Sequence, residues 1–159
     1  MPIVPPATIE GGDVLRVGRT LLVGESSRTN RAGIEALRSI VGPFGYRVVR
    51  VPVFGGLHLK TCVTALDAET CLLNRAWLDP RPLAGFRLRD VDETEPWAAN
   101  TLAVGGEIMV NAAFPRTADI IAAAGYRIRP LDMSEFAKAE AGLTCLSLLF
   151  HGAHEGPGQ

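Results

Sequence analysis

Three side chains of this sequence have the chemical types needed for nucleophilic catalysis: the thiol of Cys145, the imidazole of His58 and the carboxylate of Glu10. When these three groups converge in a cavity, they form the nucleophile, the general acid and base, and the orienting group of covalent catalysis. They are far apart in the chain. The chemistry is therefore available only if the elements that carry them meet at one point.

Each of these side chains also has an ordinary structural interpretation. Cys145 follows Gly142, a residue typical of helix ends, and opens an apolar stretch in which a free cysteine is most often a buried thiol. His58 follows a glycine-containing turn, where a single histidine is usually a surface residue. Glu10 precedes the turn Gly11-Gly12-Asp13 and could be an exposed loop acid. The local pattern leaves both interpretations open.

The cysteines argue against disulfides and structural zinc. Cys62, Cys71 and Cys145 are an odd number and have no Cys-x-x-Cys spacing, whereas a disulfide framework needs pairs and a zinc site needs clustered ligands. We expect Cys62 and Cys71, which lie in predicted strands, to be buried structural thiols.

Three similar tripeptides, forty residues apart, indicate a repeated unit. They are Gly45-Tyr46-Arg47, Gly85-Phe86-Arg87 and Gly125-Tyr126-Arg127, and each opens a predicted strand. Two alternating apolar stretches joined by a turn precede each tripeptide, a pattern that predicts a hairpin. The predicted hairpin strands are residues 14–17 with 21–23, 63–66 with 71–73, and 102–104 with 108–110.

Helices are predicted between the hairpin and the last strand of the first and third units. The first helix begins after good N-cap residues at positions 27–30 and places Ile34 and Leu37 on one face. The third unit has Pro115 in the first helical turn, where the missing N–H is harmless. In the second unit, residues 78–84 are few and hold two prolines, so they predict a shortened helix or a single turn. Each unit is thus β-β-α-β, and the fold class is α+β.

A further helix and strand are predicted after the third unit. Ser134 is expected to cap a helix that ends at Gly142, and residues 143–150 are expected to form a strand. This pair is half a unit without its hairpin.

The repeat suggests where the chemical groups lie. A β-β-α-β unit has an apolar face that it cannot bury alone, so the three units are expected to pack around a common axis or against something else. Glu10 comes just before the first hairpin, and His58 comes just before the second, ahead of a strand expected to begin at Thr61. Similar places in successive units would present both groups at the same end of the axis, where Cys145 can meet them.

Composition limits the classes of partner. The net charge is −1 and no segment gathers Lys or Arg, so the phosphate-neutralising surface that nucleic-acid binding needs is not expected. The apolar runs are shorter than the ~20 residues of a membrane span, and residues 1–10 do not have the pattern of a signal peptide. We therefore expect a cytoplasmic protein with a single domain over residues 1–150, a disordered tail over 151–159, and Trp77 and Trp97 as packing residues between units.

Four segments of the chain resemble the bacterial dimethylarginine dimethylaminohydrolases. They are Ile9-Glu10-Gly11-Gly12-Asp13, Ser26-Ser27-Arg28-Thr29-Asn30, Leu57-His58-Leu59-Lys60-Thr61, and the stretch 134–150 around Cys145. The similarity runs from about Ala7 to Phe150 in the family's order and spacing. Glu-Gly-Gly-Asp also occurs in arginine deiminases and amidinotransferases, whereas the last segment points more narrowly to the dimethylarginine branch.

The resemblance implies a role for each matching residue. Cys145 corresponds to the nucleophile, His58 to the general acid and base, and Glu10 to the carboxylate that orients the site. Arg28 matches the family arginine that binds the α-carboxylate of the substrate, a role suited to its fixed fork of donors. The implied reaction hydrolyses Nω,Nω-dimethyl-L-arginine to L-citrulline and dimethylamine through a covalent thiouronium adduct, and it requires no metal or organic cofactor.

The resemblance also implies a fold and a partner. The family fold is a closed ring of five β-β-α-β modules, the pentein-type α/β propeller, and this sequence is similar to the C-terminal three-fifths of it. The two remaining modules bring acidic residues that pair with the guanidinium and a lid loop over the pocket. Because an open ring exposes strand edges, we expect the chain to form a homo-oligomer or to pair with an N-terminal partner chain.

Two other functions fit the same residues. One is a related guanidine chemistry, either arginine deimination or amidino transfer. The other is a catalytically silent pentein fragment that acts as an assembly module and retains the three residues by descent.

Overall fold

Three sheets of three strands each form the body of the chain in the computed structural model, which describes residues 2–139 and 141–149. In every sheet the first two strands are an antiparallel hairpin, and the third strand runs parallel to the second. This arrangement confirms the forty-residue repeat and the α+β class. The strands are β1 (Val14–Val17), β2 (Thr20–Glu25), β3 (Arg47–Pro52), β4 (Val63–Ala65), β5 (Thr70–Leu73), β6 (Arg87–Asp90), β7 (Leu102–Val104), β8 (Glu107–Asn111) and β9 (Ile128–Leu131).

The crossover between the second and third strands of each sheet follows the expected pattern. In the first module it is helix α1 (Arg31–Val41), whose N-cap Asn30 accepts a hydrogen bond from the Gly33 N–H at 2.9 Å. In the third module it is α3 (Pro115–Ala123), with the proline in the first turn. The second module has only a 3-10 turn at Arg81–Leu83, as its two prolines predict. None of the helices in the described ranges is long and apolar enough to cross a membrane.

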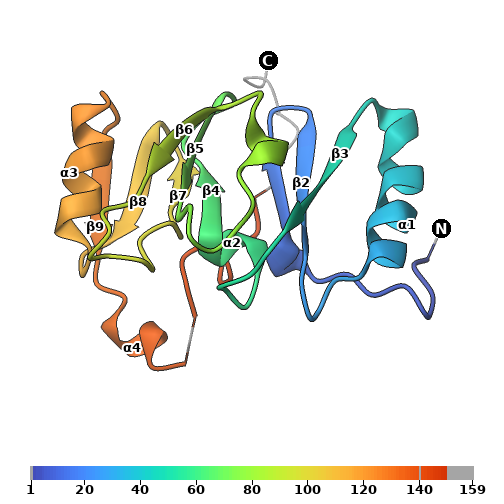
Figure 1. Cartoon of the computed structure of the whole chain (residues 1–159). Coiled ribbons are helices and arrows are strands. Elements are labelled where there is room, and N and C mark those ends of the chain that lie inside the picture. The colour runs from blue at the N-terminus through green and yellow to red at the C-terminus, as the bar shows by residue number, and fades with distance from the viewer. Residues whose placement is uncertain (1, 140, 150–159) are drawn as a thin grey trace, which may run out of the picture.

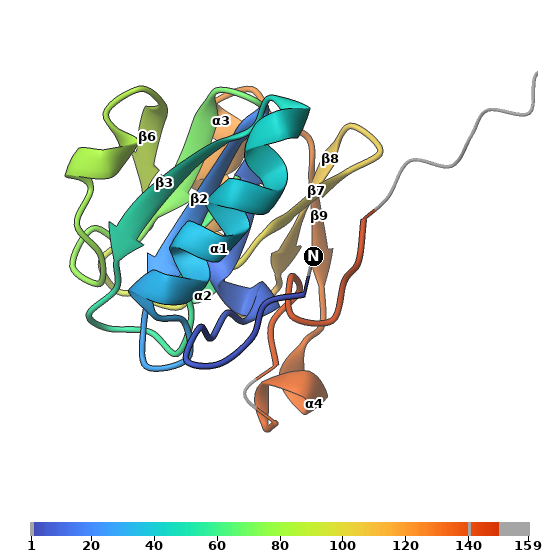
Figure 2. The same ribbon diagram turned by 90° about the vertical axis from the view of Figure 1, so that its right-hand side faces the viewer.

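The three modules stand side by side, with α1 and α3 on opposite outer sides of the row of sheets (Figures 1 and 2). The first strands of the hairpins are neighbours, since β1 contacts β4 and β4 contacts β7. The loops that lead into these strands therefore lie close together, and two of them carry Glu10 and His58.

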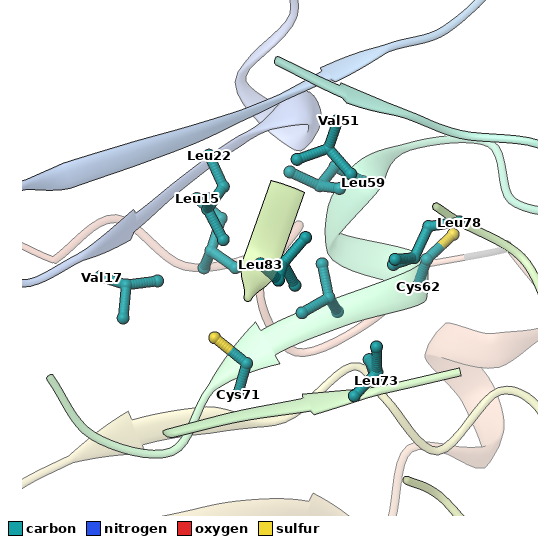
Figure 3. Packing of buried hydrophobic residues seen from close by; sticks show 11 residues of the cluster. Leu15, Val17, Leu22, Val51, Leu59, Cys62, Cys71, Leu73, Leu78 and Leu83 are labelled. Carbon is teal, nitrogen blue, oxygen red and sulfur yellow. The ribbon is translucent and has the colours of Figure 1, made fainter. Parts of the chain in front are cut away.

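Buried apolar side chains join each module to the next. The largest cluster draws residues from the strands of the first and second modules, including Leu22, Val51 and Leu73, which are all fully buried (Figure 3). A second cluster joins the second and third modules through Leu72, Ile108 and others. Because burying a large aliphatic side chain contributes about 1.5–3 kcal/mol, these clusters hold the modules in fixed positions relative to one another.

A short helix that the sequence pattern did not predict lies between His58 and the second hairpin. Helix α2 spans Leu59–Cys62, and its strand β4 begins at Val63, so the prediction that the strand begins at Thr61 was wrong. Leu59 and Cys62 are three residues apart and both fully buried. One helical turn places both on the same face, against the core, which an extended chain would not do.

The C-terminal segment departs most from the prediction. Helix α4 spans only Ser134–Ala137, so the helix predicted to reach Gly142 ends early, and Met133 rather than Ser134 is its N-cap. All four residues of α4 are exposed, and a helix that buries no apolar face gains little from packing.

Residues 143–149 form turns and irregular structure instead of the predicted strand. A strand needs a hydrogen-bonded neighbour, and no strand in the described ranges pairs with this segment. Phe150 and the predicted tail lie outside the described residues.

Candidate functional site

The carboxylate of Glu10 and the imidazole of His58 are in direct contact. Glu10 Oε1 lies 2.8 Å from His58 Nε2, although the two residues come from the entry loops of different modules. His58 is the N-cap residue of α2 and is only 8% exposed. The structure therefore excludes the interpretation of His58 as a surface residue, and it pairs Glu10 with the His58 imidazole.

The other oxygen of Glu10 faces a guanidinium group. Arg28 Nη1 lies 3.3 Å from Glu10 Oε2, and its side chain is half-exposed. Partial desolvation raises the pKa of the Glu10 carboxyl, but the hydrogen bonds and positive charges of His58 and Arg28 outweigh it and hold that pKa below its ordinary value. Glu10 is thus a carboxylate that bridges two cationic or proton-donating groups.

The buried carboxylate of Asp13 holds both Glu10 and His58 in place. Its Oδ1 accepts a hydrogen bond from the Leu59 N–H at 2.8 Å, at the residue that follows His58. Its Oδ2 accepts hydrogen bonds from the hydroxyls of Ser26 and Thr29, both at 2.7 Å. The Thr29 oxygen in turn accepts a hydrogen bond from the Glu10 N–H at 3.0 Å. Asp13 itself has no exposed surface.

Two glycines make this close packing possible. A Cβ added at Gly12 would lie 2.6 Å from the ring of His58, and one added at Gly24 would lie 2.7 Å from Asp13 Oδ1. Both distances are shorter than real carbon contacts. A glycine at position 12 lets the His58 ring lie against the backbone that leads from Glu10 to Asp13.

His58 and Cys145 line the same cavity, which has a volume of about 790 Å³. This is the size range of small-molecule sites. Cys145 is exposed, so the interpretation of this residue as a buried structural thiol is wrong. Glu10 and Arg28 are not among the residues that line the cavity. The structure thus places Cys145 and His58 at a shared space, with Glu10 behind the imidazole.

Most of the other residues that line the cavity come from the third module, the loop before it and the C-terminal segment. They include the apolar residues Trp97, Phe114 and Met133. Trp97 packs on Trp77, with ring centroids 4.5 Å apart at 69°, as expected of a residue between modules, but it is also 54% exposed and faces the cavity. Trp97 therefore packs on Trp77, as the prediction of a packing residue requires, and it also lines the cavity.

Cys62 and Cys71 are fully buried, as expected of structural thiols. Desolvation, with a smaller effect of Asp13 on Cys62 and of Asp67 on Cys71, raises the pKa of each thiol to about 12. Within the described ranges, no group of three or more His, Cys, Asp and Glu side chains is placed to hold a metal ion.

The sequence pattern predicted no role in the site for Asp13, Ser26 or Thr29. The signal was present, because Asp13 ends the Glu-Gly-Gly-Asp turn and two hydroxyl residues follow in the turn that leads into α1. What the pattern could not show is that the carboxylate points inward and reaches α2 in the next module.

Comparison with known proteins identifies the family to which this chain belongs. The family model for arginine deiminase matches residues 3–125, so the chain belongs to the arginine deiminase family. Its resemblance to the dimethylarginine dimethylaminohydrolases is confirmed by two curated relatives of that name. The one from Streptomyces coelicolor is 41% identical over 143 residues, covering 90% of this chain and 55% of the relative. The one from Pseudomonas aeruginosa is 34% identical over 148 residues, covering 93% of this chain and 58% of the relative.

A solved structure agrees with the sequence relatives. A mutant of the Pseudomonas aeruginosa enzyme, complexed with citrulline, superimposes with a TM-score of 0.85 at 32% identity and covers 92% of this chain and 58% of the other. The chain therefore spans a little over half the length of the proteins it matches.

The Asp13 network leads to a prediction about stability. Asp13→Ala is expected to lower the free energy of unfolding by about 3 kcal/mol or more, because each hydrogen bond to a charged group contributes about 1.5–3 kcal/mol. Asp13→Asn should cost less, since its amide keeps one acceptor oxygen. Urea unfolding followed by circular dichroism measures both. The exposed Asp119→Asn serves as the control and should stay within about 0.5 kcal/mol of the parent. Equal stability of Asp13→Ala and the parent would refute this role.

The depressed pKa of Glu10 leads to a prediction about pH. The carboxyl should titrate below its reference value of 4.5, as measured from its carbon chemical shift by NMR. Its contacts with His58 and Arg28 therefore contribute stability that is fully present above that value and is lost as the pH falls through the lowered pKa. Arg28→Ala should move the midpoint upward. A midpoint at or above 4.5 in the parent would contradict the arrangement seen here.

Proposed function

We propose that this chain hydrolyses Nω,Nω-dimethyl-L-arginine to L-citrulline and dimethylamine through a covalent cysteine adduct. One observation carries the proposal: the exposed thiol of Cys145 and the imidazole of His58 line one cavity, while Glu10 holds the imidazole from behind. The names of the two curated relatives support the substrate, and the citrulline in the solved relative supports the product.

In the first half of the proposed reaction, the thiolate of Cys145 attacks the guanidinium carbon. A C–S bond forms, and the C–N bond to the dimethylated nitrogen breaks. Protonated His58 supplies the proton with which dimethylamine leaves, and the carboxylate of Glu10 orients the imidazole through the 2.8 Å contact. An S-alkylthiouronium adduct remains on Cys145.

In the second half, a water molecule replaces the sulfur. Neutral His58 takes a proton from this water as it attacks the thiouronium carbon. The C–S bond then breaks and returns the Cys145 thiolate. The remaining proton of the attacking water passes to solvent, where dimethylamine takes it up as dimethylammonium, and the former guanidine carbon keeps the new oxygen as the ureido group of citrulline. His58 is again protonated, so one turnover consumes one water and restores both residues.

The cavity and Arg28 supply the recognition groups in this proposal. The apolar surfaces of Leu57, Trp97 and Phe114 suit a substrate whose leaving amine carries two methyl groups. This feature favours dimethylarginine over the unmethylated arginine of a deiminase. Arg28 would bind the substrate's α-carboxylate with the donors that Glu10 leaves free, since a guanidinium has five N–H groups.

We further propose that the three modules are blades of a pentein-type propeller completed by a second copy or by a separate N-terminal chain. The large apolar side chains of Leu146, Leu148 and Leu149 are 54%, 85% and 59% exposed next to the nucleophile. These leucines belong to a segment that pairs with no described strand, and their exposure supports a neighbouring chain that covers them. We propose that the protein is cytoplasmic, a compartment whose reducing conditions keep a free thiol such as Cys145 reduced.

The first test is citrulline release from asymmetric dimethylarginine by the parent and by Cys145→Ser. We expect turnover in the parent and a loss on the order of a thousandfold or more in the variant, because the nucleophile is gone. Cys71→Ala, a change in a buried core thiol, is the control and should keep turnover.

Light scattering on the same samples records the mass of the active species. Equal turnover in Cys145→Ser and the parent would refute the assigned nucleophile. An inactive parent that gains activity with an N-terminal partner chain would contradict completion by self-association.

A second test separates an intact site from a silent fragment. Native protein treated with 2-chloroacetamidine should be modified at Cys145 well before Cys62 and Cys71, whose burial and raised pKa keep them as unreactive thiols. Mass spectrometry of peptides gives the order. Modification at similar slow rates at all three cysteines would favour the silent assembly module.

A further inference from the structure

The segment that carries Cys145 has little regular structure of its own to hold it. Residues 142–149 form turns and irregular chain, and their internal hydrogen bonds are local, such as Ser147 Oγ to the Leu143 carbonyl at 2.7 Å. Leu143 and Thr144 are nevertheless buried, at 7% and 8% exposure, while Cys145 is exposed. Something outside the segment must therefore fix the residues next to the thiol.

The side-chain amide of Asn100 holds this segment from outside. Its Oδ1 accepts hydrogen bonds from the Thr144 N–H at 3.0 Å and from the Thr144 hydroxyl at 3.2 Å. Over the described part of the chain, these are the only hydrogen bonds that join residues 142–149 to a distant part of the sequence. Gly142 also lies against this amide, because a Cβ at that position would be 2.5 Å from Asn100 Nδ2.

Asn100 is itself held by a buried pair of hydroxyls. The Thr64 hydroxyl donates to the Ala99 carbonyl at 2.6 Å and accepts from the Thr101 N–H at 3.2 Å. The two threonine hydroxyls are 2.7 Å apart, and both side chains are at most 2% exposed. The backbone on both sides of Asn100 is thus fastened to β4.

Strand β4 begins directly after α2, the helix whose N-cap is His58. The chain leads from His58 through α2 to Thr64, whose buried hydrogen bonds hold the backbone beside Asn100, and the partly buried side chain of Asn100 then contacts Thr144. The two ends of this path, His58 and Cys145, are the two groups that must meet the same carbon atom in the proposed reaction.

We propose that Asn100 is a positioning residue that fixes the Cys145 thiol at the cavity relative to His58. The inference rests on the proposed function, because that reaction requires the Cys145 thiol to be aligned with His58. An amide suits this position because its oxygen accepts both hydrogen bonds without adding a negative charge beside the thiolate. Asn100 also lines the cavity that Cys145 and His58 line.

The test compares two small alkylating agents at Cys145. Both react when the thiolate displaces chloride, so that a C–S bond forms as the C–Cl bond breaks. 2-Chloroacetamidine carries the planar cation of a guanidine substrate, whereas 2-chloroacetamide is its neutral counterpart. The ratio of their rates at Cys145, measured by mass spectrometry over a range of pH, reports whether the thiol reacts as part of the site.

The parent is expected to prefer the amidine. Asn100→Ala should reduce this preference by about tenfold or more, because a displacement of about 1 Å in a reacting group can cost on the order of a hundredfold in rate. Asn100→Asp keeps the acceptor oxygen, so it should keep the preference, with the rates shifted to higher pH by the added charge. Because the added carboxylate also attracts the amidine cation, this retention counts as rescue only together with a lowered preference in Thr144→Val, which adds no charge.

Asn74→Ala is the matched control. Asn74 donates a hydrogen bond to the Pro96 carbonyl at 3.0 Å and so holds the same loop as Asn100, but it makes no hydrogen bond with residues 142–149. It should lower stability and leave the preference for the amidine near that of the parent. If Asn100→Ala does not fold, Thr144→Val carries the test. It removes only the hydroxyl donor and should lower the preference about threefold, less than the loss of a whole contact.

The outcomes distinguish failure of the role of Asn100 from failure of the proposed function. If the parent prefers the amidine and Asn100→Ala or Thr144→Val prefers it equally, the role of Asn100 is overturned. The proposed function then remains intact. A parent without any preference for the amidine overturns the proposed function and the role of Asn100 with it. Loss of the preference in Asn100→Ala and its retention in Asn100→Asp and Asn74→Ala supports the inference.

Discussion

The buried carboxylate of Asp13 is the constraint on which the candidate site depends. It lies at the end of the turn that carries Glu10, and it reaches into the next module to accept the backbone N–H that follows His58. A buried charge is tolerable only when it is fully hydrogen-bonded. The three donors around Asp13 therefore have to stay where they are, and with them the loop of Ser26 and the first turn of α2. The Glu10–His58 contact is a consequence of this network.

The modular architecture explains why such a contact can form between distant parts of the chain. Each sheet repeats one topology, and its hairpin begins next to the hairpin of its neighbour. Loops that enter equivalent strands thus come together at one side of the molecule. The apolar clusters between modules keep that side fixed, so that groups on separate modules can hold a distance of 2.8 Å. Packing between the modules therefore brings groups from separate repeats together in one site.

The Cys145 end of the candidate site is held more sparsely than the His58 end. His58 is buried, hydrogen-bonded to Glu10 and followed by a helix fastened to Asp13, whereas Cys145 is exposed on a segment joined to the third module through Thr144 and Asn100. In the proposed assembly, further modules would pack beside the exposed leucines that follow Cys145.

The sequence by itself determined the repeat, the hairpins, the α+β class and the residues capable of chemistry, because alternation, turn residues and capping residues act over a few positions. It also indicated that Glu10 and His58 would meet, since both precede a hairpin. Only the tertiary structure decided that Asp13 links two modules, that α2 precedes β4, that residues 143–149 are not a strand, and that Asn100 holds Thr144. Each of these depends on a hydrogen-bonding partner, or the lack of one, that is distant in sequence, and a local pattern holds no information about which distant group will be there.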